Sequence, residues 1–332
     1  FRSVEPYVGY GTGDYSRLIC RTVYAPKHAQ SGELIRGIRG MLAIPAPRTH
    51  VQASIDDMPL NTVQIGVSEV YDKVDRTRDL GSEYAISDSA GYLDLVAEHR
   101  LVPGIHRVSY SVANRKPVSA NLYTIPASAK VGIISDVDDT IMITQAPVPW
   151  KAAYNLLFLD PKKKASVPGM SVLFTRIADL FPGAPFFYLS TSPWNVESSI
   201  RNFITDHGFP EGPLLLRDLD PRPKTFVPTG PQHKLEFAEQ LMADFPDMKF
   251  ILVGDDGQKD PTTYATIARR YPGRVLAIVI RELSPRESTG LASVTGLTST
   301  QPTPVTDVPV FTGTTGSNIL KTMLPYLKTV LR

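Results

Sequence analysis

Two aspartates, Asp136 and Asp138, stand two residues apart directly after the apolar run Val131-Gly-Ile-Ile-Ser135. At this spacing one carboxylate can attack phosphorus and form an aspartyl phosphate, while the other protonates the leaving oxygen and then deprotonates water. Carboxylates this close repel unless a cation neutralises them, and Mg²⁺ favours carboxylates combined with phosphate oxygens. The pattern indicates magnesium-dependent phosphoryl transfer; the alternative is an acidic loop with turn and helix-capping duties.

Hydroxyl groups follow a second apolar run. Ser190-Thr191-Ser192 comes directly after Phe186-Phe-Tyr-Leu189, and Pro193-Trp194 can then open a helix. A hydroxyl and backbone amides at a helix start suit a phosphate oxygen. Helix capping by Ser192 is the alternative, and both roles can hold at once.

A lysine and a second acidic group complete the set. Lys234 opens a helical stretch, where its ammonium could stabilise the phosphoryl group and the attacking carboxylate, although an isolated lysine is usually solvated surface. Asp255 and Asp256 follow the run Phe250–Val253, so Asp255 is placed to bind magnesium, while Asp260 can hold the ligands or Lys234 in position. Four such features in one order argue against coincidence.

The elements that would position these residues alternate along the chain. Short apolar runs typical of strands buried on both faces are Val131–Ile134, Phe186–Leu189, Phe250–Val253 and Val275–Ile280. Helical spacing lies between or after them at about Pro168–Phe181, Trp194–His207, Gln232–Phe245 and Pro261–Tyr271. This alternation predicts a doubly wound parallel α/β sheet, in which ligands bind beyond the carboxyl ends of the strands.

The part of the chain before this sheet has a different texture. Between about Leu34 and Ile125, short alternating runs such as Val63–Val70, His106–Val112 and Ser119–Ile125 are separated by turn signals. They predict an all-β sandwich. We therefore expect two domains, a β-sandwich over residues 1–127 and a doubly wound α/β domain over residues 128–332. Glu282–Pro309 is expected to be mainly loop, followed by a strand at Val308–Phe311.

A helix is predicted from about Asn318 to the end of the chain. It could be an amphipathic membrane contact, with apolar residues between Lys321, Lys328 and Arg332. Pro325 is expected to interrupt it, and packing against the sheet is the favoured alternative.

The charge and composition of the chain limit which kinds of partner and compartment are expected. The 332 residues carry a formal net charge of +2, which gives no argument for nucleic acid as a partner. The single cysteine, Cys20, excludes an intramolecular disulfide and a cysteine-rich zinc site. No apolar run reaches the roughly 18 residues of a membrane span. Because the chain starts at Phe1 rather than Met, we expect that a segment was removed, by signal-peptide cleavage or by trimming. The compartment stays open: soluble or peripheral to a membrane, inside the cell or exported.

At these residues the chain resembles the haloacid dehalogenase-like phosphatase superfamily. Asp136-x-Asp138-x-Thr140 matches its first motif and Ser190 its second, Lys234 matches the third, and Gly254-Asp255 with Asp260 matches the fourth. The resemblance implies Asp136 as nucleophile and Asp138 as general acid and base. It also implies Mg²⁺ held by Asp136, the backbone carbonyl of Asp138 and Asp255.

A narrower resemblance, to the actin-patch-associated phosphatidate phosphatase family, covers most of the chain. Its bacterial members carry a β-rich domain first, and Pro6-Tyr-Val-Gly-Tyr-Gly-Thr12 is similar to their opening. Thr191 stands where Asn is expected, and Asp256, where Ser is expected, adds negative charge beside the metal. The strings that carry the resemblance are Ser135-Asp-Val-Asp-Asp-Thr-Ile141, Val167-Pro-Gly-Met170, Tyr188-Leu-Ser-Thr-Ser-Pro-Trp194, Leu214-Leu-Leu-Arg-Asp218, His233-Lys234 and Gly254-Asp-Asp-Gly-Gln-Lys-Asp-Pro261.

This resemblance implies phosphatidate as substrate, met at a membrane surface. The insertion Met142–Val167 is too short for a large cap, so an open site is expected. Its Lys162-Lys-Lys164 run could contact anionic headgroups, at about 1 kcal/mol per charge, or be a solvated loop. Arg217 is a candidate phosphate contact, with an ion pair to Asp218 or Asp220 as the alternative.

Two other functions stay open at this point. One is a phosphatase for a soluble phosphometabolite or a phosphoprotein, since the motifs define the chemistry better than the substrate. The other is a binding or scaffold protein that acts through the β-sandwich.

Overall fold

The computed structural model describes residues 1–25, 44–60, 62–65, 85–88, 90–113, 115–143, 164–217, 230–257, 259–284 and 306–331. The chain divides into two compact units. The first runs from Phe1 to Ser128 and takes in Pro193–Asn195, and the second holds most of the chain from Ala129 onward.

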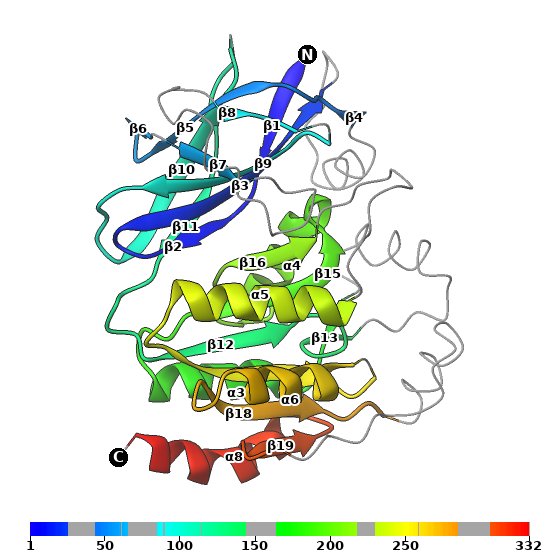
Figure 1. Ribbon diagram of the computed structural model, residues 1–332. Helices are drawn as coiled ribbons and strands as arrows, with labels where there is room; N and C mark the ends of the chain where they lie inside the picture. The colour runs from blue at the N-terminus through cyan, green and yellow to red at the C-terminus, as the bar shows by residue number, and fades with distance from the viewer. Residues whose placement is uncertain are drawn as a thin grey trace. The chain divides into compact units, whose positions relative to one another are not determined.

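The first unit is built of strands, drawn in blue to green in Figure 1. The described strands hydrogen-bond in the order β6-β5-β10-β11-β2-β3-β9-β7, with β1 and β4 paired to β3 and β8 paired to β5. Every pairing is antiparallel except that of β11 with β2. The strands are β1 (Arg2–Pro6), β2 (Gly9–Gly11), β3 (Tyr15–Tyr24), β4 (Ile44–Pro45), β5 (His50–Ile55), β6 (Met58–Pro59), β7 (Thr62–Ile65), β8 (Ala85–Ile86), β9 (Tyr92–Glu98), β10 (Gly104–Ser111) and β11 (Val118–Thr124).

Alternation explains how these strands bury one face. In β5 every second residue, Val51, Ala53 and Ile55, is buried, as expected for side chains that point to opposite faces in turn. These residues join Leu18, Leu93 and Leu122 in one apolar core. The predicted strands at His106–Val112 and Ser119–Ile125 correspond to β10 and β11. Of the predicted strand Val63–Val70, only the part within β7 lies in the described residues.

The second unit contains a six-stranded sheet in the order β16-β15-β12-β17-β18-β19. The pairs β12–β15, β12–β17, β17–β18 and β18–β19 are parallel, which confirms the predicted parallel sheet. The chain enters at β12, moves outward through β15 and β16, and then returns to the other side of β12 at β17. The strand order thus reverses between β12 and β17. The strands are β12 (Val131–Asp136), β15 (Phe186–Pro193), β16 (Leu214–Arg217), β17 (Lys249–Asp255), β18 (Val275–Arg281) and β19 (Val310–Gly313).

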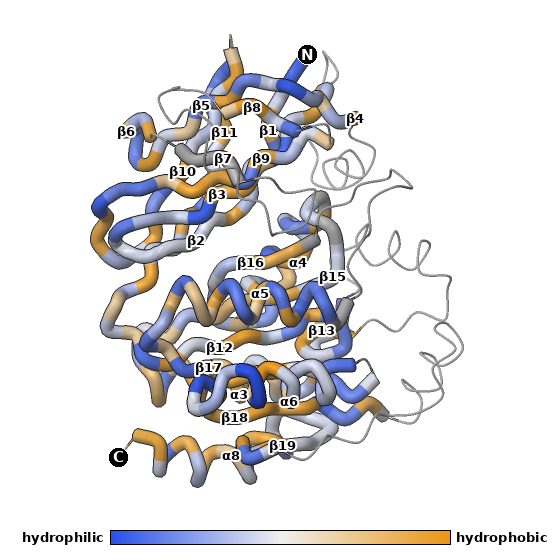
Figure 2. The backbone as a smooth tube through the Cα atoms, viewed as in Figure 1, coloured by the Kyte–Doolittle hydropathy of each residue, from blue (hydrophilic) through white to orange (hydrophobic). Residues whose placement is uncertain are grey.

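Apolar sequence makes these strands the interior of the unit. All six residues of β12 are buried, and in β17 only Lys249 is exposed. Figure 2 shows β12 and β18 coloured largely as hydrophobic. A small antiparallel ribbon follows the loop after β12 and joins β13 (Met142–Ile143) to β14 (Ala165–Ser166).

Helices cover the sheet. Helix α3 buries Met170, Leu173, Phe174 and Ile177, the stripe of an amphipathic helix. It packs against α8, while α5 packs against α6 (Figure 1). The helical segments are α3 (Met170–Leu180), the 3₁₀ turn η2 (Trp194–Val196), α4 (Glu197–Asp206), α5 (Gly230–Asp244), α6 (Asp260–Arg270) and α8 (Gly316–Val330).

The predicted interruption of the last helix at Pro325 is wrong. Helix α8 continues through Pro325, and its buried residues include Ile319, Met323 and Leu327. Packing against α3 and β19 offsets the backbone hydrogen bond that proline cannot donate. The apolar stripe faces protein, as the favoured alternative expected.

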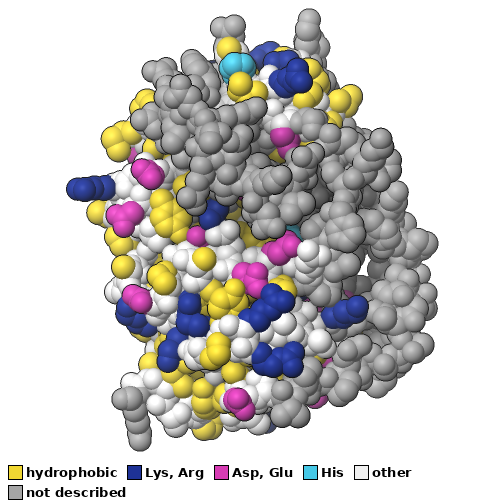
Figure 3. Space-filling model, in the orientation of Figure 1, with side chains coloured by type: hydrophobic (Ala, Val, Ile, Leu, Met, Phe, Trp, Pro, Cys, Tyr) yellow, Lys and Arg dark blue, Asp and Glu magenta, His cyan; other side chains and the backbone are white. Residues whose placement is uncertain are grey.

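On the face drawn in Figure 3, the coloured Lys and Arg side chains lie among Asp and Glu side chains. Among the described helices, none has the length and apolar character needed to cross a membrane.

Candidate active site

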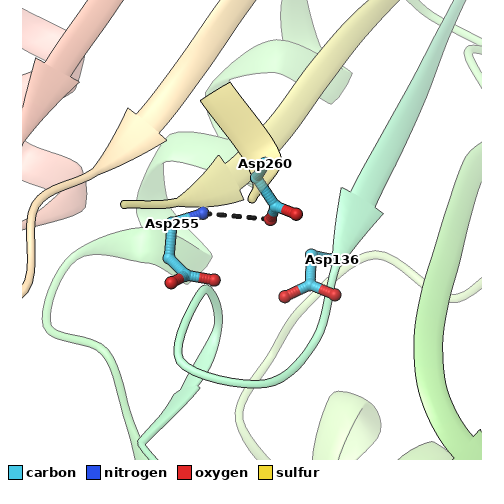
Figure 4. A group of neighbouring side chains, drawn as sticks. All are labelled: Asp136, Asp255 and Asp260. Atoms are coloured by element: carbon cyan, nitrogen blue, oxygen red, sulfur yellow. Dashed lines mark hydrogen bonds between the residues drawn. The ribbon is translucent and has the colours of Figure 1, made fainter. Parts of the chain in front are cut away.

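Three aspartates meet where the strand order reverses. Asp136 ends β12, Asp255 ends the neighbouring strand β17, and Asp260 begins α6 (Figure 4). One carboxylate oxygen of each lies within 4.8 Å of the others, and all three side chains are buried. The carboxyl ends of parallel strands on either side of such a reversal form the usual ligand site of an open α/β sheet.

A glycine allows the aspartates to approach one another. A Cβ atom at Gly254 would lie 2.3 Å from Asp260 Oδ2 and 2.8 Å from a ring carbon of Tyr264. With hydrogen there instead, Asp260 Oδ2 accepts a hydrogen bond from the Asp255 amide at 3.3 Å. The Tyr264 hydroxyl donates to the Val253 carbonyl at 2.9 Å and so ties α6 to β17.

Lys234 of α5 supplies the positive charge at the triad. Its Nζ lies 2.9 Å from Asp136 Oδ1 and 2.5 Å from Asp260 Oδ1. Burial raises the pKa of Asp136 and of Asp255 well above the usual range, and the Lys234 ammonium opposes that rise. Burial alone would lower the pKa of Lys234, but the carboxylates of Asp136 and Asp260 raise it, so the amine stays protonated.

Asp138 faces a different partner. Its Oδ2 accepts a hydrogen bond from Ser190 Oγ of β15 at 2.8 Å, and Ser190 Oγ in turn accepts one from the Ser192 amide at 3.0 Å. Burial raises the pKa of Asp138, and the Ser190 hydrogen bond lowers it. The carboxylates of Asp136 and Asp138 therefore lie in distinct surroundings and can do different chemistry.

The loop after β12 is held in shape from two sides. Thr140 Oγ1 donates to Asp136 Oδ2 at 3.2 Å, which leaves Lys234 on the other oxygen of that carboxylate. Asp139 adopts a positive φ of 56°, and its carbonyl accepts a hydrogen bond from Arg281 Nη1 at 2.9 Å.

Sequence reasoning missed Arg281. It lies buried at the carboxyl end of β18, directly after the predicted strand Val275–Ile280. Asp136 and Asp255 were predicted because they directly follow apolar strands. Arg281 also directly follows one, so the same reasoning could have found it.

Lys164 differs from its predicted role as an exposed lysine. Its side chain is buried, at 4% exposure, and its Nζ donates to Ser199 Oγ of α4 at 2.7 Å. The interpretation of Lys164 as a surface headgroup contact is therefore wrong. Lys162 and Lys163 lie outside the described residues.

The remaining candidates lie beside the site or beyond what is described. Thr191 is half-buried in β15. Arg217 ends β16, and its side chain lies outside the described part of the chain. Asp256 accepts a hydrogen bond from the Leu283 amide at 2.8 Å and is not one of the three clustered carboxylates. Its negative charge is thus partly offset by a backbone dipole.

The aspartate cluster fits a hard cation. Three buried carboxylates offer oxygen ligands within 4.8 Å of one another, and carboxylate oxygens are what hard divalent ions bind. Both oxygens of Asp260 already have protein partners, Lys234 and the Asp255 amide. Both oxygens of Asp136 are engaged as well, by Lys234 and Thr140, so a metal ion held by either carboxylate would share an oxygen with one of these donors.

A buried acidic cluster with a lysine, at the strand-order reversal of a parallel sheet, defines an α/β protein with a metal-compatible acidic site. Comparison with known proteins narrows this class: residues 131–282 match the family model "Phosphatidate phosphatase APP1, catalytic domain". Over these residues, which make up less than half of the chain, the sequence is similar to the APP1-like phosphatidate phosphatase family, in agreement with the resemblance of its motifs.

Two curated proteins are similar to this chain. Phosphatidate phosphatase APP1 of Saccharomyces cerevisiae is 29% identical over 211 residues, which cover 61% of this chain and 35% of the relative. An uncharacterized protein of Schizosaccharomyces pombe is 26% identical over 176 residues, or 52% of this chain and 29% of its own. The chain thus spans about a third of the length of these relatives.

Solved structures add no argument about the fold. A carbohydrate esterase aligns with 100% of this chain and 97% of its own at 8% identity, with a TM-score of 0.28. The Yersinia pseudotuberculosis adhesin InvE covers 63% of this chain and 56% of its own at 10% identity, with a TM-score of 0.21.

Proposed function

We propose that the chain is a magnesium-dependent phosphomonoester hydrolase that converts phosphatidate to diacylglycerol and phosphate through an aspartyl phosphate on Asp136. The observation that carries the proposal is the setting of Asp136, at the end of β12, with Lys234 on one carboxylate oxygen and Thr140 on the other. These contacts fix the orientation of a carboxylate that would attack phosphorus.

The proposal includes the fold and the domains. Residues 128–332 form a doubly wound, haloacid dehalogenase-like catalytic domain, and residues 1–127 form a preceding β-sandwich of unknown binding role. The strand order, with its reversal between β12 and β17, supports the first part. The predominantly antiparallel pairing and shared apolar core of the first unit support the second.

The two aspartates would share one reaction cycle. A carboxylate oxygen of Asp136 attacks phosphorus, the bond from phosphorus to the ester oxygen breaks, and Asp138 gives that oxygen a proton. Asp138 then takes a proton from water, which attacks phosphorus, releases inorganic phosphate and restores Asp136. The hydrogen bond from Ser190 supports this role because it holds the Asp138 carboxylate apart from the aspartate cluster.

The proposed magnesium site uses the carboxylates of Asp136 and Asp255 and the backbone carbonyl of Asp138. When bound, Mg²⁺ would neutralise charge between the substrate phosphate and these carboxylates. Asp260 would hold Lys234 and the end of β17 in place. Thr191 and Arg217 are proposed as further contacts to the substrate.

The substrate assignment rests on the family match and on the name of the yeast relative. A phosphorylated lipid would be met at a membrane surface, so peripheral contact with a bilayer is part of the proposal. The test compares phosphate release from phosphatidate in mixed vesicles with release from sugar and nucleoside monophosphates at equal magnesium. Higher kcat/KM for the lipid supports the assignment; clearly higher kcat/KM for the soluble esters, with vesicles neither bound nor hydrolysed, overturns it.

A further inference from the structure

Lys164 is a buried cation joined to both sides of the candidate site. It directly precedes β14, which pairs with β13 at the end of the loop that carries Asp138. From there its Nζ donates to Ser199 Oγ of α4 at 2.7 Å, and α4 follows the strand that carries Ser190. Only 4% of its surface is exposed.

The charge of Lys164 acts on Asp138. Burial lowers the pKa of Lys164 to about 8, and the Asp138 carboxylate raises it. In return, the Lys164 ammonium lowers the pKa of Asp138. The backbone geometry agrees, because Asp138 forms a β-bridge with Met142, and Met142 pairs with Ser166, two residues after Lys164. Lysine is seldom this buried unless negative charge is at hand.

Lys234, the first cation of the site, is already shared between two carboxylates. Lys234 contacts both Asp136 and Asp260, two carboxylates for one ammonium. A substrate phosphate dianion would bring further negative charge between Asp136 and Asp138. Lys164 is a second cation on the Asp138 side, where in the proposed reaction the ester oxygen leaves.

We infer that Lys164 binds the phosphate group of the substrate from the Asp138 side of the site. The hydrogen bond to Ser199 fixes the direction of the Lys164 ammonium. The pairing of β13 with β14 places Lys164 near the loop that follows β12. The inference rests on the proposed function and adds a substrate-binding residue to it. The competing explanation is a purely structural brace between β14 and α4.

Four variants separate the two explanations. Lys164→Met keeps the length and bulk of the side chain but removes its charge, whereas Lys164→Arg keeps the charge. Ser199→Ala removes the hydrogen-bond partner and leaves the ammonium. Lys249→Met is the matched control, because Lys249 is exposed at the start of β17, at the opposite end of that strand from Asp255.

The experiment measures kcat and KM at neutral pH with magnesium, for phosphatidate in mixed micelles and for p-nitrophenyl phosphate. Calorimetry gives the Kd of inorganic phosphate, and thermal unfolding reports stability. In Lys164→Met we expect KM for both substrates and Kd for phosphate to rise about tenfold or more, as for loss of a hydrogen bond to a charged group. Lys164→Arg should recover most of the loss, and Lys249→Met should match the wild type.

Three results would overturn the inference. The first is unchanged KM and Kd in folded Lys164→Met. The second is equal losses of binding and stability in Lys164→Met and Ser199→Ala, which identify a brace. The third is a rise in KM for phosphatidate alone, which would tie Lys164 to the lipid part of that substrate rather than to its phosphate group. If the wild type hydrolyses neither ester, the proposed function fails, and the Kd for phosphate still decides whether Lys164 binds that anion.

Discussion

Lys234 Nζ lies 2.9 Å from Asp136 Oδ1, and each of the two side chains is only 2% exposed. A buried ion pair of this kind is costly to form and costly to break, because removal of one partner leaves a buried charge alone. Here Asp136 also belongs to a cluster of three carboxylates. The Lys234 ammonium therefore favours the ionised form of Asp136 against the effect of burial, and a nucleophile toward phosphorus needs that form.

Removal of the metal should stop turnover, and magnesium should restore it. In Asp255→Asn we expect both the activity and the rise in thermal unfolding temperature on addition of magnesium to be lost, because one ligand charge is gone. Asp256→Asn is the matched control, since an amide oxygen can still accept the hydrogen bond from the Leu283 amide. Full activity in excess chelator would contradict the role given to Asp255.

Gly254→Ala should reduce both stability and turnover. The added Cβ would meet Asp260 Oδ2 at 2.3 Å, so Asp260 must move away from Lys234, at a cost of about 1–3 kcal/mol. Gly208→Ala serves as comparison, because its Cβ would meet nothing within 4 Å although its φ is +70°. It should lower stability alone. Wild-type turnover in Gly254→Ala would mean that Asp260 does not position the site.

Arg281→Met should lower kcat about tenfold or more with a smaller change in KM, because Arg281 holds the Asp139 carbonyl and so the turn directly after Asp138. Arg274 offers a matched control. It also donates to backbone carbonyls, those of Met242, Phe245 and Met248, but away from the aspartate cluster. Arg274→Met should reduce stability and spare kcat; equal kcat losses in both variants would refute the positioning role.

Glu197 should make stability depend on pH. Burial raises its pKa from 4.5 to about 7, while Arg201 lowers it. An acid whose pKa rises on folding binds a proton more tightly in the folded state, so its contribution is full below about pH 4.5 and is lost as the pH rises through 7. The loss can reach about 3 kcal/mol.

Unfolding free energies at pH 5 and pH 8 test this. The difference between the two pH values should shrink in Glu197→Gln, which is neutral throughout, and stay at the wild-type size in Glu211→Gln, where the replaced carboxylate is exposed. An unchanged difference in Glu197→Gln would show that another group controls the dependence.

Much of the second unit could be predicted because local sequence and burial agree there. The runs that became β12, β15, β17 and β18 are apolar over four or more residues, which suits strands covered on both faces. Since ligands gather at the carboxyl ends of such strands, the sequence alone could place Asp136 and Asp255 at the same edge of the sheet. The geometry then added which oxygen of Asp136 meets Lys234.

The rest depends on contacts between distant residues. Arg281 and Asp139 are 142 residues apart in the chain, and no local pattern pairs them. Lys164 stands in a polar run that reads as solvated, and only the hydrogen bond to Ser199 on α4 shows otherwise. Pro325 would break an isolated helix, but the packing of Ile319, Met323 and Leu327 keeps α8 whole.

The central claim is that Asp136 carries the phosphoryl group, and chemical trapping tests it most directly. Enzyme turning over p-nitrophenyl phosphate with magnesium is quenched and treated with borohydride, which reduces an aspartyl phosphate to homoserine, and mass spectrometry then locates the change. We predict homoserine at position 136, more of it in Asp138→Asn because hydrolysis of the intermediate slows, and none in Asp136→Asn. Wild-type turnover by Asp136→Asn, or trapped homoserine at any other aspartate, would contradict the account.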